Sequence, residues 1–250
     1  MIEHHSLRVL QESPFARRLW SFVQLKEEDL AVLSDLYRRR RAFPVGGEII
    51  HQGQNDPSAF VLISGWVASY RVLADGKRQI MDLHLPGDLI GLRSALLRTS
   101  DCTVEPITPI KACELLRSDT LFDFTRTPRL ATALLLDALQ DQALINEHLV
   151  DLGRRSAGVR MAHFLLELGS RLRRVGMATC AGYDCPLSQY HLADALGLTA
   201  VHVNRVLREL REAGLLTFQR SRVTYGNYDA LVQYAGFETG YLDQERPLVA

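Results

Sequence analysis

Apolar residues recur at helical intervals on both sides of Gly197. They are Leu192, Ala193 and Leu196 before the glycine and Val203, Val206, Leu207 and Leu210 after it. Ser188 and Thr199 precede the two apolar stripes, where a hydroxyl group can accept hydrogen bonds from the first free backbone amides of a helix. Glycine adopts the positive φ of a tight corner without strain. The pattern therefore predicts two short helices joined by a turn, the arrangement of a helix-turn-helix.

The second predicted helix carries polar and small residues opposite its apolar stripe. Ala200, Val201, His202, Asn204, Arg205 and Arg208 lie on or beside this face. Such a face can enter the major groove of DNA and contact base edges. Two amphipathic helices around a glycine can instead pack inside a protein core, so the following residues decide between the two interpretations.

Those residues form the pattern of a β-hairpin. Gly214 ends the second helix, and apolar side chains then alternate along two short runs, 215–218 and 223–225. A hairpin in this position is a wing beside a helix-turn-helix. Arg220 and Arg222 near its tip suit contacts with DNA phosphates, although charged hairpin tips are also ordinary solvated turns.

The pattern from residue 43 to about 116 is that of short strands punctuated by glycine. The apolar runs are 48–51, 59–63, 66–72, 79–84 and 110–115. Many short strands at this spacing favour an antiparallel sandwich or roll, and Asp75-Gly76 is its clearest hairpin turn.

Residues 1 to about 40 have helical apolar spacing and end in a run of four arginines, Arg38 to Arg41. A basic run can bind nucleic acid, but a solvated helix end explains this one better, because cations stabilise a helix C-terminus.

A long helix is expected from about 129 to 152. Its apolar positions alternate at steps of four and three, as in the seam of a two-stranded coiled coil. The seam residues are Ala131, Leu135, Ala138, Gln142, Ile145, Leu149 and Leu152. A single helix packed on its own domain is the alternative, but acidic residues flank the narrow seam, which favours a homodimer. A hinge around 153–158, a helix at 159–173 and a short helix at 228–235 complete the pattern.

Composition limits the class of protein. A chain of 250 residues with 47% hydrophobic and 23% charged residues is typical of a soluble globular protein. The sequence shows neither a membrane-spanning run nor a signal-type N-terminus, so we expect a cytoplasmic protein without membrane contact. The four cysteines match neither a disulfide framework nor the spacing of a two-pair zinc site.

The formal net charge of zero conceals an uneven distribution. Residues 154–225 contain 11 arginines and no lysine against 5 acidic residues, a balance of +6, whereas the rest has 18 basic and 24 acidic residues. A basic module joined to an acidic one fits a DNA-binding half attached to a half that stays off DNA.

In this order, the motifs resemble the CRP/FNR superfamily of bacterial transcription regulators over nearly the whole chain. They are PVGGEII at 44–50, QG at 52–53, VLISG at 61–65, DG at 75–76, LPGDLIG at 85–91, LADALGLT at 192–199 and VNRVL at 203–207. The resemblance implies an α+β fold: an N-terminal antiparallel β-roll (a double-stranded β-helix), a long dimerisation helix and a C-terminal winged helix-turn-helix. The expected domains are a sensor at 1–127, the dimerisation helix at 128–153, the DNA-binding domain at 154–228 and a tail at 229–250.

At the positions where the resemblance implies contacts with cyclic AMP, this chain has residues that do not suit that ligand. Where such relatives place a ribose-binding glutamate this chain has Leu92, and at the phosphate-binding Arg-Ser pair it has Ser100 and Asp101. Ile145 and Asn146 replace the adenine-facing Thr-Ser pair. An anionic phosphate buried without a cation is costly. Arg93 and Arg98, which lie nearby in the sequence, are the alternative source of a positive charge.

Other family cofactors are tested in the same way. An iron–sulfur cluster is disfavoured, because no cysteine precedes Cys102. Haem stays open, with His51, His84 or His148 as candidate axial ligands, although lone histidines are more often structural. Cys180 and Cys185 are a weak candidate for a redox or metal pair.

The resemblance also implies roles for residues at the DNA. Ser188 and Gln189 match phosphate-contacting positions, Thr199 matches the capping position, and Arg205 matches an arginine that contacts guanine or phosphate. Val201 stands where relatives place a glutamate that reads a G·C pair. Valine can touch a thymine methyl group but cannot accept a hydrogen bond from cytosine, so the half-site of the relatives should not be assumed.

We therefore expect a homodimeric regulator that reads a two-fold symmetric double-stranded operator and relays an effector or redox signal from the roll through the long helix. RNA polymerase is a further candidate partner. One alternative is a roll without ligand in a protein controlled by its abundance or by a partner. Another is a small cupin-like enzyme, which would need metal ligands such as His51, Asp82 and His84.

Overall fold

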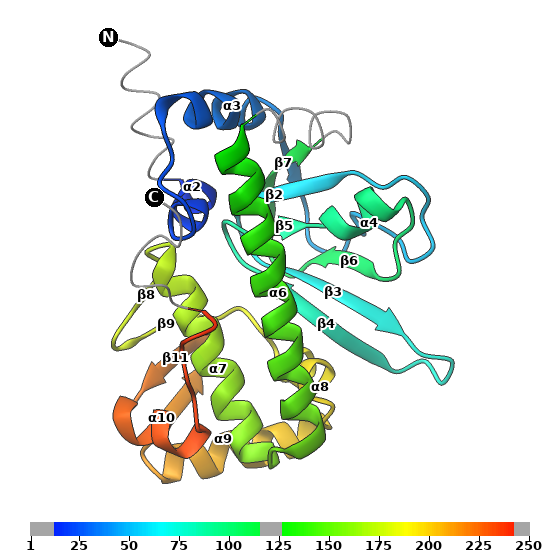
Figure 1. The fold of residues 1–250 in the computed structure, drawn as a ribbon. Coiled ribbons are helices and arrows are strands. Elements are labelled where there is room, and N and C mark those ends of the chain that lie inside the picture. Colours follow the sequence, from blue (N-terminus) through cyan, green and yellow to red (C-terminus); the bar gives the residue numbers. More distant parts are fainter. Residues whose placement is uncertain (1–12, 116–126, 243–250) are drawn as a thin grey trace. The chain divides into compact units, whose positions relative to one another are not determined.

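The computed structural model describes residues 13–115 and 127–242 (Figure 1). The chain forms two compact units. Of the described residues, the first unit contains 13–71, 82–115 and 127–139, and the second contains 72–81 and 140–242. None of the helices in these ranges is both long and apolar enough to cross a bilayer.

Two helices begin the first unit. Helix α2 (Pro14–Trp20) starts after Ser13, whose hydroxyl accepts a hydrogen bond from the amide of Ala16 at 3.2 Å, and helix α3 (Glu27–Tyr37) follows. Helical structure is thus confirmed for the described part of the N-terminal segment, while residues 1–12 lie outside the described residues.

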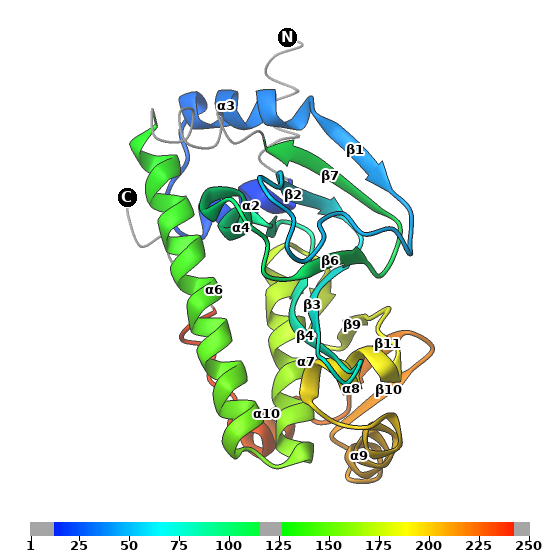
Figure 2. The ribbon, with the colours of Figure 1, turned by 90° about the vertical axis from the view of Figure 1, so that its right-hand side faces the viewer.

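The arginine run is not a helix end throughout. Arg38 is the residue at the C-terminus of α3, but Arg40 and Arg41 belong to strand β1 (Arg40–Phe43). This strand pairs antiparallel with β7 (Ile110–Leu115), beside which it lies in Figure 2. The interpretation as a solvated helix end was therefore wrong for these two residues, because they supply backbone partners to β7 while their charged side chains remain exposed.

The strands of the first unit form two sheets. The remaining strands are β2 (Ala59–Ser64), β3 (Val67–Val72), β4 (Arg78–His84), β5 (Leu89–Ile90) and β6 (Thr103–Pro106). The sheet orders are β1-β7-β2-β5 and β4-β3-β6. Four of the five predicted runs are strands. The run 48–51 makes only an isolated bridge, between Ile50 and Val104, and β5, β6 and helix α4 (Leu92–Leu97) had no clear pattern.

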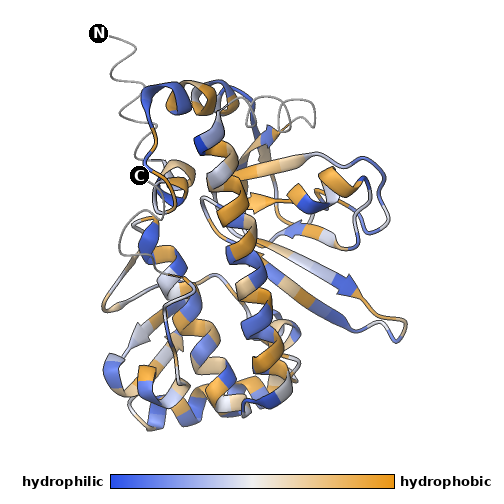
Figure 3. Ribbon diagram, viewed as in Figure 1, coloured by the Kyte–Doolittle hydropathy of each residue, from blue (hydrophilic) through white to orange (hydrophobic). Residues whose placement is uncertain are grey.

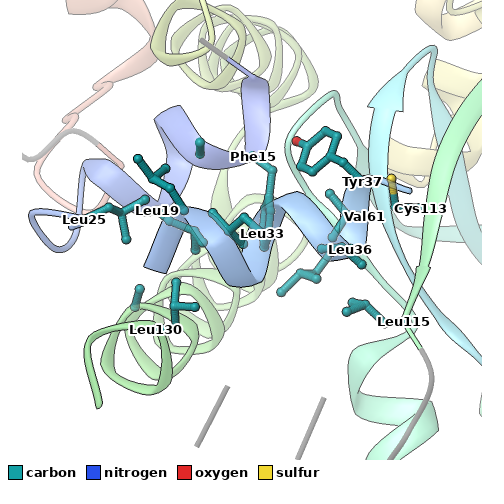
Figure 4. Close-up of a cluster of buried hydrophobic side chains, with 14 of the residues drawn as sticks. Phe15, Leu19, Leu25, Leu33, Leu36, Tyr37, Val61, Cys113, Leu115 and Leu130 are labelled. Atoms are coloured by element: carbon teal, nitrogen blue, oxygen red, sulfur yellow. The ribbon is translucent and has the colours of Figure 1, made fainter. Parts of the chain in front are cut away.

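Strand β2 is buried on both faces, and its alternating side chains enter two different cores. Phe60 and Leu62 pack in a cluster that both sheets share, with Val67 of β3 and Val104 of β6. Ala59 and Val61 face a second cluster, which brings together α2, α3, β7 and the start of the long helix (Figure 4). That cluster includes Phe15, Leu19, Leu33, Leu36, Cys113, Leu115, Leu130 and Ala133. The predicted antiparallel roll therefore has helices packed on one of its sheets.

The long helix α6 spans Pro128–Arg154, two residues beyond its expected end. Apolar segments recur along its whole length in Figure 3. Helix α7 (Ala157–Arg174) begins after Ser156, whose hydroxyl accepts a hydrogen bond from the amide of Val159 at 3.4 Å. The break between the two helices falls within 153–158, the range predicted as a hinge.

The second unit contains three more helices and a small sheet. The helices are α8 (Gln189–Leu196), α9 (Ala200–Glu212) and α10 (Tyr228–Ala235), and α10 matches the expected range. The sheet joins β8 (Ala178–Thr179), β9 (Gly182–Asp184), β10 (Leu216–Gln219) and β11 (Arg222–Tyr225) in the order β10-β11-β9-β8. The predicted hairpin is β10–β11. Strands β8 and β9, which extend its sheet, were not expected.

Candidate nucleic-acid interface

The corner between α8 and α9 is built as the sequence predicts. The hydroxyl of Ser188 accepts a hydrogen bond from the amide of His191, and that of Thr199 accepts one from the amide of His202, both at 3.2 Å. Gly197 lies between the helices with φ +62°. Arg160 of α7 donates a hydrogen bond to the carbonyl oxygen of Leu196 at 2.6 Å, which ties the corner to the rest of the unit.

Helix α9 has one buried and one exposed face. Val203, Val206 and Leu210 are buried as expected, and Leu207 is half-buried. On the other side, Val201 is 81% exposed, and Asn204, Arg205 and Arg208 are exposed too, while Ala200 and His202 are half-buried. The structure thus brings the predicted reading residues together on one helix face. Tyr190, in the first turn of α8, is also highly exposed, although nothing in the sequence pattern marked it.

Two of the exposed side chains are held by neighbours. Gln189 and Asn204 exchange two hydrogen bonds, each of 2.5 Å. Arg205 donates to Nε2 of His202 at 2.9 Å and lies 3.7 Å from a carboxylate oxygen of Glu209. Arg205 is therefore orientated along the helix surface, and Asn204 is orientated toward the start of α8.

The tip of the wing is a tight turn. Gln219 is paired with Arg222, and between them Arg220 and Ser221 both have positive φ, +51° and +55°. A two-residue turn of this handedness matches the twist of a hairpin. Arg220 is exposed at the tip, but Arg222 is the first residue of β11 and forms an ion pair of 2.6 Å with Asp184 of β9. Arg222 therefore flanks the turn as expected, but its side chain is paired with an acid of the neighbouring strand.

Asp101, one of the residues predicted to face an effector, is an acid bound by two arginines. Asp101 accepts hydrogen bonds from Arg93 of α4 at 2.6 Å and from Arg71 of β3 at 2.5 Å. Burial alone would raise the pKa of the Asp101 carboxyl, but the hydrogen bonds and charges of Arg93 and Arg71 bring it below its ordinary value. Arg71 lies some 30 positions earlier in the chain, so sequence proximity did not reveal it.

The other effector candidates take no part in these ion pairs. Ser100 is buried and donates to the carbonyl oxygen of Cys102 at 2.7 Å. Leu92 packs half-buried against the helical cluster, and the exposed Arg98 lies 3.9 Å from Asp56. Ile145 and Asn146 are exposed on the part of α6 that belongs to the second unit.

The candidate ligand residues have structural partners. His84 is hydrogen-bonded to Ser69 at 2.6 Å, His148 to Glu167 at 2.9 Å, and His51 to Glu48. Nowhere in residues 13–115 and 127–242 do three His, Cys, Asp or Glu side chains gather in a way that could hold a metal ion.

The two late cysteines differ in exposure. Cys180 is exposed in the turn between β8 and β9, whereas Cys185 is buried, and burial raises the pKa of its thiol to about 12. A thiol that stays protonated is a poor nucleophile and metal ligand, so Cys185 does not suit a reactive pair.

The expected dimer seam is an unpaired apolar stripe. Six of its seven residues are exposed, with Leu149 at 70% and Leu135 at 61%, and Ala131 is half-buried. The opposite side of α6 is buried within its own units through Leu130, Ala133 and Leu144.

Known proteins match both halves of the chain. Residues 40–127 match the cyclic nucleotide-binding domain family, and residues 159–234 match the Crp-like helix-turn-helix domain family. A probable transcriptional activator of Rhizobium leguminosarum bv. viciae is 32% identical over 185 residues, covering 73% of this chain and 75% of the relative. The nitrogen fixation regulation protein FixK of Rhizobium meliloti is 31% identical over 182 residues, covering 71% of this chain and 77% of the relative.

The similarity extends to solved structures. FixK2 from Bradyrhizobium japonicum superimposes with a TM-score of 0.70 at 28% identity, covering 78% of this chain and 96% of that chain.

Proposed function

The chain belongs to the CRP/FNR superfamily of transcription regulators, and we propose that it binds a two-fold symmetric DNA operator as a homodimer. The relatives described above are a probable transcriptional activator and a nitrogen fixation regulation protein. The observation that carries the proposal is the exposed face of α9, whose reading side chains stand out from a helix that is capped and buried on its other side. Two such helices in a dimer would enter major grooves about one helical turn apart.

The side chains on α9 support a base preference of their own. Val201 offers a methyl contact to thymine, and Arg205 offers two donors to guanine or to a phosphate. Within the described residues Arg208 and Arg220 have no ion-pair partner, so their charges are available to DNA phosphates. The side chains of Ser188, Thr199 and His202 are further candidates for phosphate contacts.

The seam on α6 supports the homodimer. An apolar stripe that runs along the helix and is exposed in one copy can be buried by the same stripe of a second copy. We propose the domain division expected from the sequence, with the sensor before α6 and the reader after it. Such a regulator would act in the cytoplasm, where RNA polymerase is its candidate partner.

A second version of this function has a roll that needs no effector. It is favoured by Asp101, whose carboxylate already neutralises Arg71 and Arg93. A cyclic nucleotide phosphate would meet an acid at this position and would have to displace it from both arginines. In this version the amount of protein, or a partner, sets the regulatory output. Calorimetry with cyclic nucleotides and a visible spectrum for haem distinguish the two versions.

Selection of bound sequences from random DNA tests the proposal. We expect enrichment of a symmetric site with two half-sites about one helical turn apart. The absence of any enriched sequence would contradict DNA reading by α9.

The variant Arg205→Ala tests the reading helix itself. We expect it to weaken binding to the selected operator by ~1–3 kcal/mol, because one charged donor pair to a base or phosphate is lost. Arg211→Ala is the matched control, since Arg211 is exposed in the last turn of the same helix and is not a predicted contact. Fluorescence anisotropy at fixed salt measures both, and equal affinities for Arg205→Ala and wild type would contradict the assignment.

A further inference from the structure

Gln189 and Asn204 form a closed pair of carboxamides across the corner of the helix-turn-helix. Nε2 of Gln189 donates to Oδ1 of Asn204, and Nδ2 of Asn204 donates to Oε1 of Gln189, each at 2.5 Å. Both side chains are exposed, one at the start of α8 and the other on the reading face of α9. The pair therefore belongs to the surface that the proposed function places against DNA.

Asn204 cannot read adenine alone while this pair exists. A carboxamide has two N–H groups and two acceptor sites on its oxygen. The second N–H of Asn204 donates to the carbonyl oxygen of Ala200 at 3.2 Å, so both of its donors are used within the protein. Adenine requires a donor for N7 and an acceptor for its N6 amino group, and Asn204 retains only the acceptor.

Gln189 supplies the missing donor. In a pair of carboxamides joined by two hydrogen bonds, the remaining N–H of one group lies beside the remaining lone pair of the other. One edge of this pair is closed by Ala200. The opposite edge therefore presents the second N–H of Gln189 next to the free lone pair of Asn204.

We propose, on the basis of the proposed function, that Gln189 and Asn204 read one adenine together as a composite donor–acceptor fork. Nε2 of Gln189 donates to N7, and Oδ1 of Asn204 accepts from the N6 amino group. Guanine carries an acceptor, O6, where adenine carries N6, so it would face the acceptor of Asn204 and is rejected. Gln189 is then a base-reading residue, and not only the phosphate contact that its position at the start of α8 indicates.

The experiment is a double-mutant comparison of base preference. Wild type, Gln189→Ala, Asn204→Ala and the double variant each select bound sites from random DNA, and their affinities are measured for sites with adenine or guanine at each position. We expect both single variants to lose the preference for adenine at the same half-site position, by roughly 5- to 150-fold. The double variant should lose no more than either single one, because each half of the fork fails without the other.

Two further variants separate reading from support. Gln189→Glu can still accept from Asn204 but has no N–H to donate, so it should lose the preference for adenine while its thermal unfolding midpoint stays at the wild-type value. Gln233→Ala, an exposed glutamine on α10, should change neither quantity.

The outcomes distinguish this inference from the function on which it rests. A symmetric site selected by wild type, with unchanged adenine preference in Gln189→Ala, would overturn the composite fork alone. A uniform loss of affinity for all sequences in that variant would do the same and would leave Gln189 as a phosphate contact. Failure of wild type to select any site would overturn DNA reading, and the composite fork with it.

Discussion

Helix α6 is anchored in different ways in the two units to which it belongs. Residues 128–139 pack in the first unit through Leu130 and Ala133, which are fully buried among apolar side chains. Residues 140–154 pack in the second unit mainly through polar groups, and Leu144 is their one buried apolar side chain. One helix therefore combines an apolar anchor with an ionic one.

The apolar anchor also contains a buried ion site. Arg18 of α2 is only 3% exposed and contacts the carboxylates of Asp88 and Asp137. Asp88 also accepts a hydrogen bond from the amide of Leu85 at 2.7 Å. One cation thus contacts two buried acids.

The ionic anchor shares its charges among several groups. Arg155 donates to Asp151 at 2.8 Å and to Glu147 at 2.9 Å. The buried ring of His163 on α7 lies 3.2 Å from Asp151 and 3.7 Å from Glu147. Each basic group therefore has a second acid if one contact is lost.

The difference between the two anchors indicates which part of α6 can change its contacts. A tight apolar anchor holds one part of the helix firmly, whereas shared polar contacts can exchange partners at lower cost. We expect α6 to relay a signal. Its adjustable part is the C-terminal one, which is nearer in the sequence to α8 and α9.

The largest expected effect is at the firm anchor. Arg18→Met removes the cation that contacts two buried carboxylates, and we expect the free energy of unfolding to fall by about 3–5 kcal/mol. Urea denaturation followed by circular dichroism measures the loss. Arg17→Ala, at an exposed position of the same helix, should change stability by less than about 0.5 kcal/mol. A loss at Arg18 no greater than that at Arg17 would contradict a stabilising role of the buried ion site.

The seam, which runs along both parts of α6, should give the next effect. Leu149→Glu places a carboxylate in the proposed dimer interface, and we expect the dimer dissociation constant to rise by about 30- to 100-fold, or ~2–3 kcal/mol. The fold of one copy should be unaffected, because Leu149 is already exposed. Sedimentation velocity over a concentration series measures the constant. Asn146→Glu, also exposed but outside the seam, is the control, and equal behaviour of the two variants would exclude this stripe as the interface.

A smaller effect is expected at the ionic anchor. Asp151→Asn removes one acid, but Glu147 still faces both Arg155 and His163, so we expect a loss of about 1–2 kcal/mol. The same urea titration measures it. Glu147→Gln combined with Asp151→Asn should cost more than the sum of the single changes, since the shared basic groups then have neither acid. Strict additivity would show that the two acids do not share their partners.

The smallest expected effect is the pH dependence of stability that comes from the two buried thiols, one in each unit. Burial raises the pKa of the Cys113 thiol to about 11 and that of Cys185 to about 12, whereas a thiol in the unfolded chain ionises near pH ~8.5. As pH rises through this window the unfolded state loses protons that the folded state keeps, so stability falls. We expect about 1 kcal/mol per thiol between pH ~8 and ~9.5. In Cys113→Ala and Cys185→Ala the slope of stability against pH should be shallower, and an unchanged slope would contradict the assignment.

Local sequence patterns predicted much of the DNA-binding domain. The hydroxyls of Ser188 and Thr199 and the positive φ of Gly197 act within a few residues, so the sequence shows them directly. Strands β5, β8 and β9 escaped prediction because two or three residues are too few to show a period. The pairing of Arg222 with Asp184 joins residues 38 positions apart, which no local pattern records.

The sequence by itself determined the family, the order of roll, long helix, helix-turn-helix and wing, the capped helices and the apolar stripe of α6, because caps, periodicity and turn residues act over short distances along the chain. Tertiary structure alone decided which charged and polar side chains meet. It placed Arg18 beside Asp137, 119 positions away, brought Arg71 to Asp101, and joined Gln189 to Asn204 across the corner. Such contacts depend on where the packed elements cross, and burial rather than sequence distance sets their strength.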